Sequence, residues 1–274
     1  MERISQDAWL ERHPYLRPVA DFHAQVALAA ASIPIAKTQF PNWDDYSGDY
    51  HAGIPLLRSS CVTVDFEPAE AIVVSLLENL TSRPLPEKLA EETRVLDAQL
   101  HSDRDARRRA IAWLLGNDAF VTAHPGLLRF LGWASLARYL CPLVEAFGGW
   151  RDEERWLRGY CPTCGSVPTM SQLIGVDPGR QRLLSCGCCG TRWRFRRIGC
   201  PFCEGGDAYR LAVLAIEGEG GLRIDYCESC GADLKTYNGE GSESLLLADW
   251  TSLHIDLVAC DRGLKRIASS LYEL

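Results

Sequence analysis

The sequence predicts an α+β protein: a helical N-terminal domain, then two tandem four-cysteine metal-binding ribbons, then a C-terminal helix. The first observation behind this is that apolar residues recur at helical spacing until about Trp156. The second is that four Cys-x-x-Cys pairs and short alternating runs follow that point. We expect domain boundaries at 1–158 for the helical domain, 159–198 and 199–245 for the two ribbons, and 246–274 for the C-terminal helical segment.

Four helical stretches are expected in the N-terminal domain. They cover about residues 19–32, a segment beginning at Pro68, residues 86–115 with a break near His101, and residues 125–147. Pro142 is expected to kink or end the last of these. Residues 41–57 are expected to form a long aromatic-rich loop that is either functional or packed as a cap.

The C-terminal half contains short strand-like runs rather than long helical patterns. Strands are expected at 169–174, 191–198, 209–216 and 222–225. A final helix is expected over 250–260, resuming over 264–271.

Four Cys-x-x-Cys knuckles carry the chemistry of this half. They are Cys161/Cys164, Cys186/Cys189, Cys200/Cys203 and Cys227/Cys230. Two residues between the cysteines let a tight turn aim both sulfurs at one point, and a following glycine permits the positive φ that such a turn needs. Two knuckles supply the four thiolates of a tetrahedral site of the zinc-ribbon kind.

The gaps between the knuckles favour two sequential sites. Cys164 and Cys186 are separated by 21 residues and Cys203 and Cys227 by 23, enough for a hairpin, whereas only 10 residues separate Cys189 from Cys200. The first site would then use the first two knuckles and the second site the last two. A cross-braced pairing of first with third and second with fourth is the alternative.

Each site is coordinatively closed, so neither has the open position of a Lewis-acid centre. Four thiolates suit both zinc and iron, and coordination rules alone make zinc the safer expectation. The remaining cysteines fall outside the pattern. Cys188 is expected to be an extra thiol, free at the surface or with a role beside the metal, and Cys61, Cys141 and Cys260 are expected to be core residues.

Residues 191–197 alternate in a way that is typical of a strand. Trp193 and Phe195 would share one face, and the other would carry arginines. Those arginines could bind an acidic partner or a nucleic acid, or could form a solvated face that offsets the nearby thiolate charge. The candidate partner-binding residues are Arg192, Arg194, Arg196 and Arg197.

Composition and charge limit the function classes. The chain has 274 residues, 47% of them hydrophobic, and a formal net charge of −7, which makes nucleic acid an unfavoured partner. No stretch is expected to be long and apolar enough to cross a bilayer, no signal peptide opens the chain, and so we expect a cytoplasmic protein without membrane contact. The six histidines are scattered and no catalytic motif is present, so we expect no enzyme.

The ordered knuckles resemble the FdhE family of formate dehydrogenase accessory proteins. The resemblance rests on the residues 53–57 (Gly-Ile-Pro-Leu-Leu) and on the runs 161–166, 186–193, 197–203 and 227–235. It implies a non-catalytic maturation factor that contacts the catalytic subunit of formate dehydrogenase in the cytoplasm. It also implies rubredoxin-like modules, which favours two iron ions over zinc.

Two other functions fit the residues. A rubredoxin-type electron-transfer module would require iron. A nucleic-acid-binding zinc ribbon would use the arginine strand and would bind in a steeply salt-dependent way; the acidic charge disfavours it.

Overall fold

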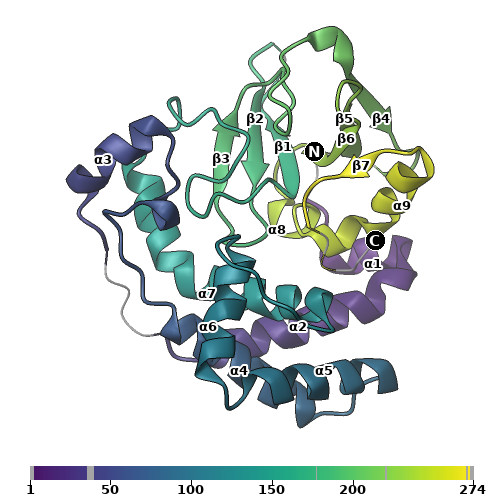
Figure 1. Ribbon diagram of the computed structural model, residues 1–274. Helices are drawn as coiled ribbons and strands as arrows, with labels where there is room; N and C mark the ends of the chain where they lie inside the picture. Colours follow the sequence, from purple (N-terminus) through teal and green to yellow (C-terminus); the bar gives the residue numbers. More distant parts are fainter. Residues whose placement is uncertain (1–2, 36–39, 177, 220, 270, 272–274) are drawn as a thin grey trace.

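The computed structural model describes residues 3–35, 40–176, 178–219, 221–269 and 271. Most helices gather on one side of a mixed β-sheet (Figure 1). The helices are α1 (Gln6–Arg12), α2 (Arg17–Ser32), α3 (Trp43–Ala52), α4 (Glu67–Thr81), α5 (Glu87–Leu100), α6 (Arg104–Leu114), α7 (Pro125–Trp150), α8 (Glu243–Leu246) and α9 (Leu253–Asp261). The strands are β1 (Met170–Ile174), β2 (Gln181–Ser185), β3 (Arg192–Phe195), β4 (Leu211–Ala215), β5 (Leu222–Cys227), β6 (Ala232–Asn238) and β7 (Lys265–Arg266).

Helices α2, α4, α5, α6 and α7 confirm the helical stretches expected from apolar spacing. The break expected near His101 falls at the C-cap of α5. Helices α4 and α7 cross at small, fully buried side chains, where the hydroxyl of Ser135 donates a 2.6 Å hydrogen bond to the carbonyl of Ala69. This bond satisfies a buried hydroxyl and fixes helices α4 and α7 against each other.

Helix α3 corrects the loop expected over residues 41–57. Its N-cap Asn42 accepts a hydrogen bond from the backbone N–H of Asp44, and Gly53 ends it with a φ of 81°. Tyr46 and Tyr50 lie four residues apart on its buried face and pack against the aromatic end of α7. The segment after α3 packs on the first knuckle, because the N–H groups of Leu56 and Leu57 donate to carbonyls of that knuckle.

Helix α7 also differs from expectation. It continues through Pro142 to Trp150, so that proline does not end the helix. By length and composition alone α7 could cross a membrane, so the expectation that no stretch would be long and apolar enough is wrong. However, 61% of its most apolar window is buried inside the protein, as suits a core helix.

The strands of both ribbons join in one sheet with the order β3-β2-β1-β6-β5-β4. Each ribbon is an antiparallel three-stranded meander. The two meanders meet where β1 pairs in parallel with β6, with Ser171 opposite Thr236. Strands β1, β3, β4 and β6 therefore run in the same direction. Each of them follows one knuckle, so all four knuckles lie at the same end of the sheet.

The C-terminal segment is only partly as expected. The 3₁₀ turn Asp249–Ser252 and helix α9 confirm the helix over 250–260. The helix expected over 264–271 is wrong for the described residues, because Lys265 and Arg266 form β7, which pairs in parallel with β6. Helix α1 and strands β2 and β6 were not expected from the sequence.

Two hydrophobic cores hold these parts together. One joins helices α2 to α7 with the first ribbon, including Trp193, Phe195 and the sulfurs of the first two knuckles. The other joins α1 and the start of α2 with β5, β6 and α9. The first ribbon is thus buried against the helical part, whereas helices α1 and α9 pack on the second ribbon.

Candidate metal centres

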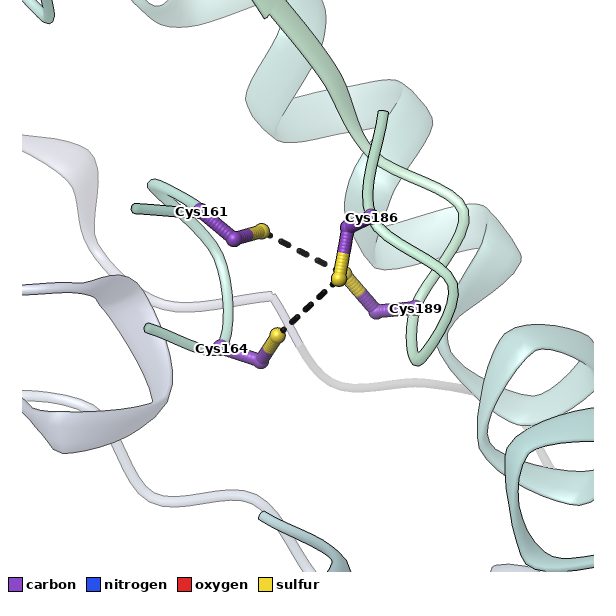
Figure 2. A group of neighbouring side chains, drawn as sticks. All are labelled: Cys161, Cys164, Cys186 and Cys189. Carbon is purple, nitrogen blue, oxygen red and sulfur yellow. Dashed lines mark hydrogen bonds between the residues drawn. The ribbon is translucent and has the colours of Figure 1, made fainter. Parts of the chain in front are cut away.

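The first centre brings together Cys161, Cys164, Cys186 and Cys189 (Figure 2). Cys161 and Cys164 come from the loop before β1, and Cys186 and Cys189 from the loop after β2, with the four side chains pointing at one another. The Sγ atoms of Cys161 and Cys189 are 3.6 Å apart, and those of Cys164 and Cys186 are 3.5 Å apart. All four cysteines are buried.

The second ribbon contains a second centre with the same arrangement. Its residues are Cys200, Cys203, Cys227 and Cys230. The Sγ atoms of Cys200 and Cys230 are 3.7 Å apart, and those of Cys203 and Cys227 are 3.8 Å apart. The structure therefore groups the knuckles sequentially and not in a cross-braced way.

These distances fit a tetrahedral ion. Four sulfurs held about 2.3 Å from one ion lie about 3.8 Å from each other. The sulfurs are too far apart for disulfides, which need about 2.05 Å, and all eight cysteines are free thiols. Each cluster could therefore hold one metal ion, with all four positions filled by protein.

The knuckle turns form as the glycine pattern predicts. Gly165, Gly190 and Gly231 have φ values of 81°, 75° and 73°, and each donates its N–H to the carbonyl of the first cysteine of its knuckle. The third knuckle has Glu204 at this position. Glu204 takes the same left-handed conformation, with a φ of 56°, and its carbonyl accepts a hydrogen bond from Arg196.

Replacing Glu204 by glycine should therefore stabilise the second centre. A side chain in the left-handed region costs about 1 to 2 kcal/mol, and the greater freedom of glycine in the unfolded chain returns about 0.5 to 1 kcal/mol of this. We expect Glu204→Gly to raise the free energy of unfolding by up to about 1 kcal/mol, measured by urea unfolding. Glu228→Gly, in the next knuckle, serves as the control; an equal gain there would contradict this account.

Buried thiols packed this closely do not ionise independently. Hydrogen bonds from Cys161, Cys186 and the neighbouring thiols lower the pKa of Cys164. At Cys186, hydrogen bonds with Cys161 and Cys164, together with burial, raise the pKa. Burial raises the pKa of Cys189. A cation is what allows all four sulfurs to be thiolates at once.

Backbone groups supply part of the compensating charge at the second centre. Burial raises the pKa of Cys227, but hydrogen bonds from the backbone of Cys230 and Ser229 outweigh it and lower the pKa to about 7. At Cys200, burial prevails and raises the pKa to about 12. The turn N–H groups thus face the sulfurs, as the spacing of the knuckles predicts.

Three of the four remaining cysteines differ from expectation. Cys188 is an extra thiol outside the tetrad, as expected. Of the two places expected for it, it takes the one beside the first centre, because it is fully buried and its thiol hydrogen-bonds Cys164. Cys61, Cys141 and Cys260 are exposed and not core residues. The apolar or helical sequence around these three cysteines predicted burial, but each thiol lies on the solvent-facing side of its segment.

The arginine strand has the expected two faces. Trp193 and Phe195 are 0% and 2% exposed. The arginines have partners within the protein: Arg192 donates to Gln172, Arg194 pairs with Glu154, Arg196 donates to the carbonyl of Glu204, and Arg197 donates to the carbonyl of Pro178. Among these four side chains, those of Arg196 and Arg197 are exposed.

The two centres differ in their access to solvent. At the second, Cys203 is exposed and Cys230 partly so, whereas the first is closed on all sides. We expect a chelator to remove one metal ion quickly, from the second centre, and the other slowly. The measurement is metal release to a chromogenic chelator. Cys203→Ser should remove the fast phase and keep the slow one; a single phase in the wild-type protein would contradict this.

A third group of potential ligands was not found from the sequence. His13, Glu219 and His254 place three ligand atoms within 4.8 Å of one another. They come from the end of α1, the turn between β4 and β5, and the first turn of α9. No local spacing could reveal them, because the three residues are far apart along the chain.

Comparison with known proteins agrees with the cysteine geometry. The family model described as "FdhE, central domain" matches residues 160–197, which hold the first centre. An FdhE homologue from Pseudomonas aeruginosa is 32% identical over 186 residues, covering 63% of this chain and 58% of the relative. One from Aquifex aeolicus is 28% identical over 146 residues, covering 52% of this chain and 50% of the relative. The chain thus spans little more than half the length of these curated relatives.

The fold is shared over nearly the whole chain. The crystal structure of the FdhE protein from Pseudomonas aeruginosa matches with a TM-score of 0.63 at 21% identity, covering 98% of this chain and 96% of that one. This chain is thus similar to FdhE proteins in the sequence around its first centre and shares the fold of one of them.

Proposed function

We propose that this protein is a non-catalytic maturation factor for formate dehydrogenase, which binds the catalytic subunit of that enzyme in the cytoplasm. The similarity to FdhE proteins supports the role in maturation. The observation that carries the non-catalytic part is that both tetracysteine clusters are coordinatively closed, which leaves no position where an ion could bind a substrate.

We propose that each cluster holds one metal ion and that the ion is iron, with zinc as the alternative. Four thiolates accept either metal, and the resemblance to the family favours iron. Elemental analysis of protein purified without oxygen decides between them. Stoichiometric zinc in a colourless protein would exclude iron.

The proposed docking face for the catalytic subunit lies beside the second centre. A cavity of about 270 Å³ opens there between residues 197–202 and strands β4 to β6, and its walls include Cys200, Cys227 and Arg197. Ile198 and Val213, which also line it, are 53% and 52% exposed. Exposed apolar side chains beside an exposed thiolate centre are typical of a surface that a partner covers.

Strand β4 adds a second element to this face. It is the last strand of the sheet, and its apolar sequence LAVLA carries no charge that would protect the edge. Among the described residues, no backbone hydrogen bond beyond its pairing with β5 is found for Leu211–Ala215. An extended segment of the partner could therefore extend the sheet next to the second centre.

Co-purification from reduced lysate of the source organism tests this proposal, with the formate dehydrogenase catalytic subunit identified by mass spectrometry. We expect the wild-type protein to recover the subunit and to restore formate dehydrogenase activity in a deletion strain. Val213→Asp should reduce both at least about tenfold. Leu28→Asp, at an exposed apolar position of α2, should reduce neither. Normal enzyme activity in the deletion strain, with no subunit recovered, would exclude the proposal.

A rubredoxin-type electron-transfer module is the second candidate. The observation that favours it is the exposure of Cys203, which places one sulfur of the second centre at the surface, where electrons could pass to a partner. It requires iron and predicts a coloured protein that is bleached reversibly by reductant. Nucleic-acid binding is least supported, because the strand arginines are already engaged within the protein.

A further inference from the structure

We propose that His13, Glu219 and His254 form a third metal site, one for a divalent cation of the zinc class, separate from the two thiolate centres. The site would join the N-terminal helix, the β4–β5 turn and helix α9. None of its ligands is a sulfur, and it has three protein ligands instead of four.

The ring of His13 lies between a backbone carbonyl and a carboxylate. Its Nδ1 lies 3.0 Å from the carbonyl oxygen of Trp9. A carbonyl only accepts hydrogen bonds, so Nδ1 must carry the proton there. In the neutral ring, Nε2 then has a lone pair, and this atom lies 2.6 Å from Oε1 of Glu219. Two acceptors cannot face each other at this distance unless a proton or a cation lies between them.

A proton on His13 would satisfy only part of the cluster. Nε2 of His254 lies 2.9 Å from the same Oε1 of Glu219. Yet Nδ1 of His254 and the buried Oε2 of Glu219 have no hydrogen-bond partner among the described residues. Buried polar atoms without partners are costly and point to a missing ion or water. One divalent ion would give each of the three side chains a bond.

The donor set suits such an ion. Two imidazoles and one carboxylate are a known zinc-binding combination that leaves a fourth position for water. Zinc-binding histidines usually donate their other N–H to a backbone carbonyl, as His13 does to Trp9.

The geometry requires only a small adjustment. Ligand atoms about 2.0 to 2.1 Å from a tetrahedral ion lie about 3.3 Å apart. The contacts of 2.6 and 2.9 Å would therefore have to lengthen by roughly 0.4 to 0.8 Å. The side chains of His13 and Glu219 are 8% and 9% exposed and that of His254 is 19% exposed, so the ion has a path in from the His254 side.

Zinc titration of the full-length protein tests the site. Isothermal titration with Zn²⁺ is carried out after both thiolate centres have been loaded and excess metal removed. We expect one further equivalent to bind to the wild-type protein. His254→Gln should weaken this equivalent at least about 100-fold, while elemental analysis still finds the two thiolate-bound ions, which shows that the variant is folded.

Two further variants complete the experiment. Glu219→Gln should have the same effect as His254→Gln and replaces it if that variant does not fold. His51→Gln, at an exposed histidine of α3, should keep the third equivalent. A wild-type protein that binds no metal beyond the two thiolate ions would overturn the proposal. So would a third equivalent that persists in both His254→Gln and Glu219→Gln.

Discussion

Cys164→Ser should abolish the metal of the first centre and prevent the first ribbon from folding. Zinc binding to a small thiolate site supplies on the order of 10 kcal/mol of folding free energy, which is comparable to the whole stability of a domain. Cys164 is 1% exposed and lies in the same core as helices α2 to α7. We therefore expect the loss to reach the helical part as well. Metal content and protease resistance measure it.

Two matched variants separate this effect from the loss of any thiol. Cys203→Ser, at the exposed sulfur of the second centre, should lose one metal ion but keep a cooperative unfolding transition for the rest of the protein. Cys188→Ala should keep both ions, because Cys188 is outside the tetrad, and should cost only the packing of a small buried side chain. Full metal content and unchanged protease resistance in Cys164→Ser would refute the prediction.

Lys235→Met should destabilise the protein by about 3 to 5 kcal/mol. The ammonium of Lys235 on β6 is 2% exposed and lies 2.6 Å from Asp256 and 2.8 Å from Asp249. Removing it leaves two buried carboxylates, whose remaining cationic partner among the described residues is Arg266. Breaking a buried ion pair on one side has a cost of this size. Because both aspartates belong to the C-terminal segment, we expect that segment to come away from the sheet first.

Urea unfolding measures this change, and hydrogen exchange along α9 locates it. Lys265→Met is the control, since Lys265 is an exposed neighbour on β7. Equal stabilities for the wild-type protein and Lys235→Met would show that the cluster of charges contributes nothing. Lys235 also ends the run 227–235, one of those that carry the resemblance to the FdhE family, and its contact with Asp256 gives this residue a structural role.

Features that depend on residues close together in the sequence could be predicted, whereas features that depend on contacts between distant residues could not. The knuckles are fixed by turn geometry within a few residues, and helices α4 and α7 by apolar spacing along one face. Strand β6 was missed because its buried Lys235 and Thr236 look like surface residues. Their partners, Asp256 and Asp225, are brought to them only by the folded sheet.

Helix α3 was missed for a different reason. Its aromatic residues Trp43, Tyr46 and Tyr50 have helical spacing, but Asp44, Asp45 and Gly48 between them are poor helix formers. Packing of the aromatic face against α7 outweighs that weak propensity. Over 264–271 the reverse happened: the apolar spacing predicted a helix, but tertiary contacts prevent it. Arg266 pairs with Asp249 and Asp256, which holds this segment as a strand next to β6.

The two edge strands of the sheet, β3 and β4, differ in whether side chains hydrogen-bond their free backbone groups, and this affects self-association. At β3, the backbone N–H of Arg194 donates to Glu153, and the carbonyl of Arg192 accepts from Arg151. In the part of the chain that the structure describes, no side chain is found bonded to the backbone of β4 in this way. If molecules stacked head to tail, the β4 edge of one molecule could pair with the β3 edge of the next, and the sheet would continue into a fibre. The β3 edge is already hydrogen-bonded by side chains of its own chain, so it cannot accept a second β4. The β4 edge therefore stays available to a different protein.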